Sequence, residues 1–252
     1  MANYRFTIAL SASVPSVKRS EKYQEFYRRI PYAQIQVEEA VISLARNVFQ
    51  AGGRLVFGGH PSISPLVTMV ATEFPINGDI EDLNRNEFGA PVTIYQSEAY
   101  ANGIAPQNSL LFNSGYAKVA WTPAVDNEQF DPTLTGTRQC LRSLTAMRKQ
   151  MLSGNIDALV CVGGMEGVEE EFELFREQQF GRPIFLLAST GGATQIISDR
   201  YRENDNVYIF GNEANKLAPK EVLKNESLTH DLDLIPFSFQ TALIVNRILS
   251  NR

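Results

Sequence analysis

The chain has 252 residues, which is enough for one large α/β domain or two smaller ones. Its hydrophobic content of 44% with 20% charged residues indicates a globular protein with a substantial core. A net charge of −5 without any basic cluster argues against a nucleic-acid polymer as partner. No apolar run approaches the length of a membrane span, about 18 residues, and the N-terminal run is too short for a secretory signal.

Two cysteines and two histidines leave little room for metal chemistry. Cys140 and Cys161 form no CxxC pattern, so we expect neither a disulfide framework nor a metal site. The chain also lacks the G-x-S-x-G elbow of hydrolases and the G-x-x-x-x-G-K-[ST] phosphate loop. We therefore expect a cytoplasmic protein with reduced thiols, no cofactor and no membrane partner.

Apolar runs alternate with helical patterns along the chain. The predicted strands are Phe6–Leu10, Leu55–Phe57, Val92–Tyr95, Lys118–Trp121, Ala158–Val162 and Ile184–Leu187. The predicted helices are Ile35–Gln50, Pro65–Phe74, Gln139–Leu152, Val168–Gln179, Ala193–Tyr201 and Phe237–Leu249. Such alternation favours parallel strands joined by right-handed crossovers. The sequence therefore predicts an α/β fold of three layers, with a doubly wound, mainly parallel sheet.

We interpret residues 1–252 as a single domain, because no repeat, low-complexity tract or linker marks a boundary. The stretch Ile76–Thr137 is less regular and richer in Asn, Pro and Gly, and we interpret it as long loops that can cover a cleft. The helix Phe237–Leu249 is amphipathic. It can pair subunits, which favours a homo-oligomer, or it can pack on its own sheet.

The turn after the strand Ala158–Val162 is the strongest candidate for a ligand site. Its glycines let the backbone turn tightly and approach a ligand closely. The next helix begins there, so free N–H groups and the helix dipole favour an anion, and Arg148 can add a fork of donors. A purely structural role is the alternative, since glutamates stabilise a helix N-terminus by about 0.3–1 kcal/mol each. The candidate contacts are Gly163, Gly164, Met165, Glu166 and Gly167.

Small residues follow three other predicted strands. Ligands of doubly wound sheets bind beyond the carboxyl ends of the strands, so we expect these turns to line one cleft. His60 can contact a ligand, although no partner for catalysis is identified. Close packing or simple helix capping is the alternative role of the small residues. The candidates are Ser11 and Ser13, then Gly58, Gly59 and His60, and finally Thr190, Gly191 and Gly192.

At these residues the chain resembles the LOG-like Rossmann superfamily, also called SLOG. This superfamily includes cytokinin-activating phosphoribohydrolases, Smf-type DNA-processing proteins and ligand-sensing modules of bacterial conflict systems. The LOG enzymes carry an Arg-Lys pair, an Asp-Ala strand and the motif P-G-G-x-G-T-x-x-E. The matching positions here are Arg148-Lys149, Asp157-Ala158, Gly164, Gly167 and Glu171.

The resemblance extends to other strand ends and includes departures. Ala9–Pro15 and Gly58–Pro65 look like a SLOG branch found in predicted defence loci. Gly163 replaces a proline of the LOG motif, Met165 and His60 replace glycines, and Val168 replaces a threonine whose hydroxyl would contact phosphate. The resemblance implies a Rossmann-like fold.

The resemblance also implies that Arg148 and Glu171 bear on an N-glycosidic bond. A carboxylate can stabilise an oxocarbenium ion or orient water, and an arginine can hold the phosphate or ribose. The same pair can clasp a ribose without cleaving it. We therefore predict a sensor of a nucleotide-derived small molecule, such as an ADP-ribose-like or cyclic nucleotide signal, in bacterial antiviral defence, with a separate effector chain. The alternatives are a nucleotide phosphoribohydrolase that releases free base, and an interaction protein with a vestigial cleft.

Overall fold

The strands form one parallel sheet. The computed structural model describes residues 4–14, 21–30, 32–75, 89–103, 115–134, 138–201, 206–211 and 235–251. The strands are β1 (Thr7–Ser13), β2 (Arg54–Gly58), β3 (Val92–Ser97), β4 (Ala117–Thr122), β5 (Ala158–Gly163), β6 (Ile184–Leu187) and β7 (Val207–Phe210). Their order is β4-β3-β2-β1-β5-β6-β7, and every neighbouring pair is parallel. The six predicted strands are confirmed, and β7 at one edge is an addition.

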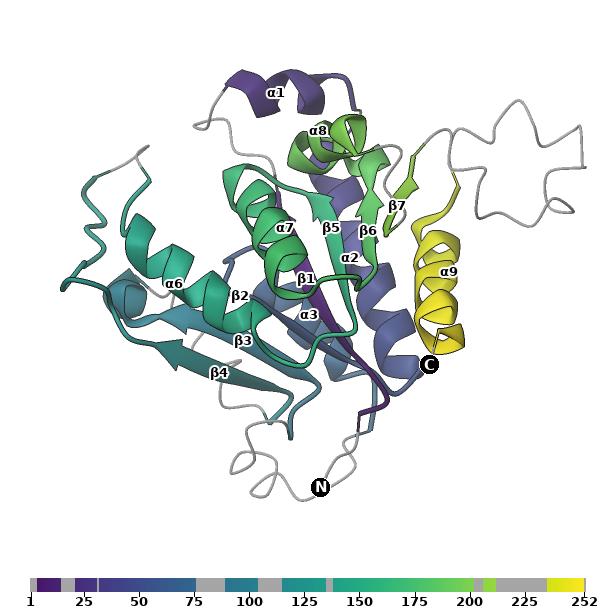
Figure 1. Cartoon of the computed structure of the whole chain (residues 1–252), viewed down its shortest axis with the longest axis horizontal. Helices are drawn as coiled ribbons and strands as arrows, with labels where there is room; N and C mark the ends of the chain where they lie inside the picture. Colours follow the sequence, from purple (N-terminus) through teal and green to yellow (C-terminus); the bar gives the residue numbers. More distant parts are fainter. Residues whose placement is uncertain are drawn as a thin grey trace, which may run out of the picture.

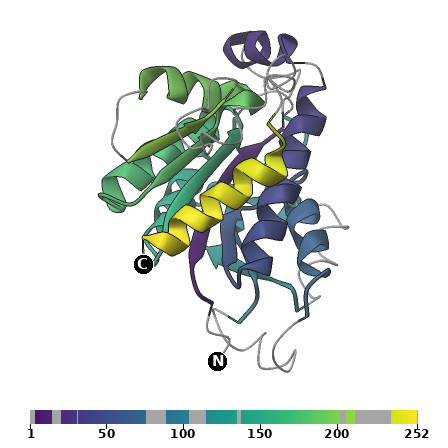
Figure 2. The ribbon, with the colours of Figure 1, turned by 90° about the vertical axis from the view of Figure 1, so that its right-hand side faces the viewer.

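Helices cover both faces of this sheet (Figures 1 and 2). One layer holds α2 (Ala33–Gln50), α3 (Ser64–Ala71) and α9 (Phe237–Ser250). The other holds α6 (Leu141–Leu152), α7 (Glu166–Gln178) and α8 (Gly192–Arg200). The helix α1 (Glu21–Arg28) packs beside α8, and η1 (Glu98–Gly103) and η2 (Ala188–Thr190) are short 3-10 turns. The predicted three-layer α/β fold is confirmed.

The central strand β5 shows why its sequence is apolar without interruption. Successive side chains of a strand point to opposite faces, and here both faces are buried. Val160 and Val162 pack with the layer of α2, whereas Leu159 and Cys161 pack with the layer of α7. Both cysteines of the chain are free and buried.

The winding of the sheet reverses next to β1. The chain adds β2, β3 and β4 on one side of β1, then returns to place β5 on the other side. Ser13 at the end of β1 therefore lies beside Gly163 at the end of β5. In doubly wound sheets the crevice for ligands opens at such a reversal. The fold thus brings two of the predicted turns together.

The helix α9 packs within the chain. Figure 2 shows it running along α2, and Ile244, Val245 and Ile248 are buried there. Asn47 of α2 donates from Nδ2 to Oγ1 of Thr241 at 2.8 Å. The apolar face that favoured subunit pairing in the sequence is therefore covered by the chain's own helix layer. Among the described residues, no helix combines the length and the apolar character needed to cross a membrane.

Candidate functional site

A cleft of about 250 Å³ opens at the carboxyl ends of β1, β2 and β5, with α6 and α7 as walls. Many of the predicted contacts line it. Those from the first two strand ends are Ser13, Gly58, Gly59 and His60. Those from α6 and the turn into α7 are Arg148, Met165, Glu166, Gly167 and Glu171. Residues far apart in the sequence thus share one cavity, because parallel strands present their carboxyl ends at one edge.

The cleft contains a buried ion pair. Arg148 donates from Nε to Oε1 of Glu171 at 3.1 Å, and Ser11 donates from Oγ to Oε2 of the same carboxylate at 2.5 Å. Both charged side chains are only 11% exposed. Burial raises the pKa of Glu171, while the charge of Arg148 and the hydrogen bond from Ser11 oppose that rise. Ser11 therefore does not line the cleft itself but holds Glu171, which does.

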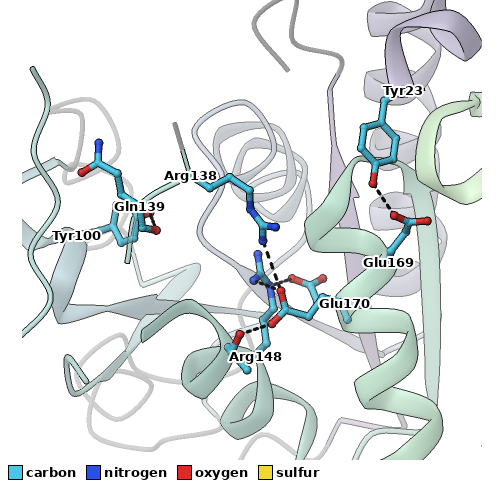
Figure 3. A network of polar contacts seen from close by, with 9 residues as sticks. Tyr23, Tyr100, Arg138, Gln139, Arg148, Glu169 and Glu170 are labelled. Carbon is cyan, nitrogen blue, oxygen red and sulfur yellow. Dashed lines mark hydrogen bonds and ion pairs between the residues drawn. The ribbon is translucent and has the colours of Figure 1, made fainter. Parts of the chain in front are cut away.

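A second carboxylate extends this pair towards the rim. Glu170 accepts a hydrogen bond at Oε2 from Nη1 of Arg148 at 2.8 Å, and at Oε1 from the hydroxyl of Thr145. Arg138 approaches the same Oε2 at 3.6 Å (Figure 3). Arg148 therefore faces two carboxylates, and Glu170 joins it to a second arginine.

Glycines at the cleft make room for these side chains. A Cβ on Gly167 would lie 2.9 Å from Nη2 of Arg148, and one on Gly58 would lie 3.2 Å from Cε of Met147. Gly59 lies so close to Gln96 that a Cβ there would be 2.0 Å from Oε1. Close packing thus explains a part of the glycine pattern, as the structural alternative predicted.

The turn after β6 lies apart from the cleft, under α1. The hydroxyl of Tyr27 donates to the carbonyl oxygen of Gly164 at 2.9 Å, and a Cβ on Gly192 would lie 2.3 Å from that hydroxyl. Thr190 accepts a hydrogen bond at Oγ1 from the Gly163 N–H at 2.6 Å. The predicted contacts that do not line the cleft are Ser11, Gly163, Gly164, Thr190, Gly191 and Gly192.

The start of α7 presents unused backbone donors. Within the described part of the chain, no acceptor is assigned to the N–H groups of Met165, Glu166 and Gly167. Such groups at a helix N-terminus favour an anion. The carboxylate of Glu166 lies at the same place, however, and its negative charge opposes that preference.

His60 is held by its own turn. The N–H of Ser62 donates to Nδ1 of His60 at 3.3 Å, and the hydroxyl of Ser64 accepts from the His60 N–H at 3.2 Å. This geometry places His60 at the cleft as a possible contact. Among the residues that the structure describes, no group of three or more histidine, cysteine or acidic side chains is arranged to hold a metal ion.

Loops within Ile76–Thr137 were predicted to cover a cleft, but the residues of the opposite wall were not predicted individually. Residues 76–88, 104–114 and 135–137 of that stretch lie outside the described residues. Tyr100 and Phe130 stack with ring centroids 4.9 Å apart, and both line the cleft together with Arg138 and Gln139. The hydroxyl of Tyr100 donates to the carbonyl oxygen of Gln139 at 2.8 Å. These residues belong to an irregular part of the chain. The aromatic residues within Ile76–Thr137 were the available signal, and no motif connects them to Arg148.

The parallel sheet, its reversal beside β1 and the cleft at that reversal define a Rossmann-like α/β protein. The chain belongs to the SLOG cluster3 family, whose model matches residues 31–211. The resemblance to SLOG proteins is thereby confirmed. Among curated proteins the chain has no match.

The solved structures that are similar to the chain include two of low sequence identity. The protein TM1055, a structural genomics target, shares 18% identity at a TM-score of 0.43, over 77% of this chain and 81% of that one. DNA processing protein A from Helicobacter pylori, described for its single-stranded DNA binding mode, shares 13% identity at a TM-score of 0.47. That match covers 91% of this chain and 83% of the other.

Proposed function

We propose that the chain binds a nucleotide-derived small molecule in the cleft and acts as a cytoplasmic ligand sensor in bacterial antiviral defence. The ligand is an ADP-ribose-like or cyclic nucleotide signal. The observation that carries the proposal is the position of the cleft at the reversal of the sheet, beside the start of α7. Nucleotide ligands bind at this place in doubly wound folds.

The chemistry of the cleft walls suits such a ligand. Tyr100 and Phe130 offer aromatic surface for a base. Arg138 offers guanidinium donors for phosphate or ribose oxygens. The carboxylate of Glu166 can accept hydrogen bonds from ribose hydroxyls. Aromatic, cationic and anionic groups around one cavity match the mixed character of a nucleotide.

Binding without cleavage is supported by the hydrogen bonds of the Glu171 carboxylate. Each of its carboxylate oxygens already accepts a hydrogen bond, one from Ser11 and one from Arg148. A general base or nucleophile needs an oxygen within reach of the reacting atom. The bonds from Ser11 and Arg148 turn the carboxylate towards the protein. This orientation favours a structural role for Glu171 over a catalytic one.

A nucleotide phosphoribohydrolase is the alternative function. It is favoured by one observation, the raised pKa of Glu171 in a residue that lines the cleft. Burial is the main cause of that rise, and a raised pKa makes a carboxyl group better suited to act as a general acid towards a leaving base. Arg148 would then hold the phosphate or ribose of the substrate.

One experiment separates these functions. The protein is incubated with nucleotides, ADP-ribose, NAD and cyclic nucleotides, and thermal shift and chromatography of the small molecules are measured on the same samples. Stabilisation by a compound that is recovered intact supports the sensor. Release of free base, abolished in Glu171→Gln, establishes the hydrolase. If no compound stabilises the protein and none releases free base, both functions are contradicted and an interaction protein is left.

A matched variant controls for the loss of a carboxylate from α7. Glu173 lies on the same helix but bonds to Arg176 and Tyr201 and does not line the cleft. Glu173→Gln is therefore expected to leave both binding and any base release unchanged. A sensor also signals to an effector chain or through its own assembly, so light scattering with and without the bound compound measures whether the oligomeric state responds.

A further inference from the structure

Arg148 is poorly placed to receive a phosphate, although its guanidinium fork suits that role from the sequence alone. Its Nε and Nη1 donate to Glu171 and Glu170, at 3.1 Å and 2.8 Å. Its Nη2 fills the space beside Gly167, where a Cβ would lie 2.9 Å from it. Two carboxylates already balance its charge, and moving it away would leave Glu171 buried with Ser11 as its remaining donor. Arg148 therefore belongs to the framework of the cleft.

The start of α7 is also a weak anion site. Glu166 lies in the first turn of the helix and lines the cleft. Within the described residues, no hydrogen bond or ion pair is assigned to its carboxylate. The negative charge of Glu166 repels a phosphate from the helix N-terminus. Val168, which also lines the cleft, supplies no hydroxyl there.

Arg138 has the properties that Arg148 lacks. Its side chain is 34% exposed and lines the cleft. Its ion pair with Oε2 of Glu170 spans 3.6 Å, whereas Nη1 of Arg148 lies 2.8 Å from the same oxygen. When Arg138 turns away, Glu170 keeps its bonds to Arg148 and Thr145. The guanidinium can thus exchange Glu170 for another anion without leaving a buried charge unpaired.

The backbone beside Arg138 is held in place. Gln139 accepts a hydrogen bond from the hydroxyl of Tyr100 at its carbonyl oxygen. Its side-chain Nε2 donates to the carbonyl oxygens of Asp131 and Leu134, each at 2.9 Å. Figure 3 shows Arg138 reaching from this anchored segment towards Glu170. The side chain of Arg138 can therefore change partner while the neighbouring hydrogen bonds of Gln139 keep the backbone in place.

We propose that Arg138 is the specificity-determining residue of the cleft and recognises an anionic group of the ligand, a phosphate, by releasing Glu170. This inference rests on the proposed function of the cleft as a nucleotide site. Glu166 then faces the part of the ligand that carries hydroxyl groups. A nucleotide would be oriented by these two opposite charges.

The test compares two probes that differ by one phosphate, adenosine 5′-monophosphate and adenosine. Their affinities are measured by calorimetry for the natural protein and for Arg138→Gln and Arg138→Lys, at low and high salt. We expect Arg138→Gln to weaken binding of the monophosphate about tenfold and to leave adenosine unchanged, because a charge-assisted contact is lost. In Arg138→Gln the affinity for the monophosphate should also depend less on salt concentration. Arg138→Lys should retain a part of the affinity.

Arg142→Gln is the matched control. Arg142 follows closely in the chain and pairs with Asp126 and Glu128, but its side chain is 63% exposed and does not line the cleft. Its removal should change neither affinity. Urea unfolding of each variant shows that it is folded.

Several outcomes would overturn the inference. One is a monophosphate affinity of Arg138→Gln equal to that of the natural protein, and another is an equal loss for both probes. If the natural protein binds ADP-ribose or a cyclic nucleotide but not the monophosphate, the role of Arg138 is refuted and the proposed function stands. If no nucleotide binds, the role of Arg138 and the proposed function are both refuted.

Discussion

Nε of Arg148 lies 3.1 Å from Oε1 of Glu171, although 23 positions separate the two residues and they belong to different helices. Their side chains meet because β5 runs between α6 and α7 and the two helices pack side by side on one face of the sheet (Figure 1). The ion pair therefore depends on the correct assembly of the strand, the turn and both helices.

Removal of the arginine should strongly destabilise the protein. Arg148→Gln leaves the carboxylate of Glu171 buried without its cation, so we expect the free energy of unfolding to fall by about 3–5 kcal/mol. Urea denaturation measures this change. Arg142→Gln removes the ion pairs of an exposed guanidinium with Asp126 and Glu128, and it should cost about 1 kcal/mol or less. Equal losses in the two variants would contradict the buried pair.

The contact between Tyr27 and Gly192 can be tested with two glycines of similar backbone conformation. Gly192 has φ +61° and a Cβ there would lie 2.3 Å from the Tyr27 hydroxyl, whereas Gly181 has φ +78° and nothing within 4 Å of a Cβ. Gly181→Ala should destabilise by about 1–2 kcal/mol through backbone strain. Gly192→Ala should destabilise by about 1–3 kcal/mol more, because a close-packed contact is overfilled. A Cβ on Gly192 would also lie 2.4 Å from the carbonyl oxygen of Gly164. Similar free energies of unfolding for the two variants would therefore show that neither the Tyr27 hydroxyl nor the Gly164 carbonyl group packs against Gly192.

The hydroxyl of Thr190 should hold the turn after β6 against the end of β5. It accepts from the Gly163 N–H and donates to the carbonyl oxygen of Leu187, both at 2.6 Å, in a fully buried position. Thr190→Val leaves both backbone groups unsatisfied, so we expect a loss of about 1–3 kcal/mol in the free energy of unfolding. Thr190→Ser keeps the hydroxyl and should lose less. The prediction fails if serine and valine are equally destabilising.

The bond between Tyr23 and Glu169 should make the docking of α1 sensitive to acid. Burial raises the pKa of Glu169, but the hydrogen bonds from Tyr23 and Lys22 outweigh it and lower the pKa below the ordinary 4.5. A lowered folded pKa contributes stability that is present above pH 4.5 and is lost as the pH falls through the folded value. Tyr23→Phe should therefore reduce the free energy of unfolding by about 0.5–1 kcal/mol at neutral pH and by less in acid.

Tyr208→Phe is the control for this pH dependence. The hydroxyl of Tyr208 accepts a hydrogen bond from Nη2 of Arg247 at 3.0 Å, and that contact involves no carboxylate. Denaturation of both variants at neutral and acid pH gives the comparison. We expect the effect of Tyr208→Phe to be the same at both. A cost of Tyr23→Phe that does not change with pH would refute the role of Glu169.

The missed elements show where sequence patterns lose their information. The strand Val207–Phe210 has four residues at the edge of the sheet, and so short an apolar run does not distinguish a strand from a loop. The helix Glu21–Arg28 is also short and mostly polar, and it buries Tyr23 and Tyr27. Neither element is long enough to show a clear hydrophobic period, and both are stabilised by packing on neighbouring elements.

The sequence alone determined the fold and one wall of the cleft. The apolar run Ala158–Val162, the glycines after it and the alternation of strands with helices are local properties, because side-chain period and backbone freedom act over a few residues. Only the tertiary structure decided that Tyr27 covers the turn at Gly192 and that Arg138 reaches Glu170. Those contacts join residues far apart in the chain, and their geometry depends on how whole helices pack, which no local pattern encodes.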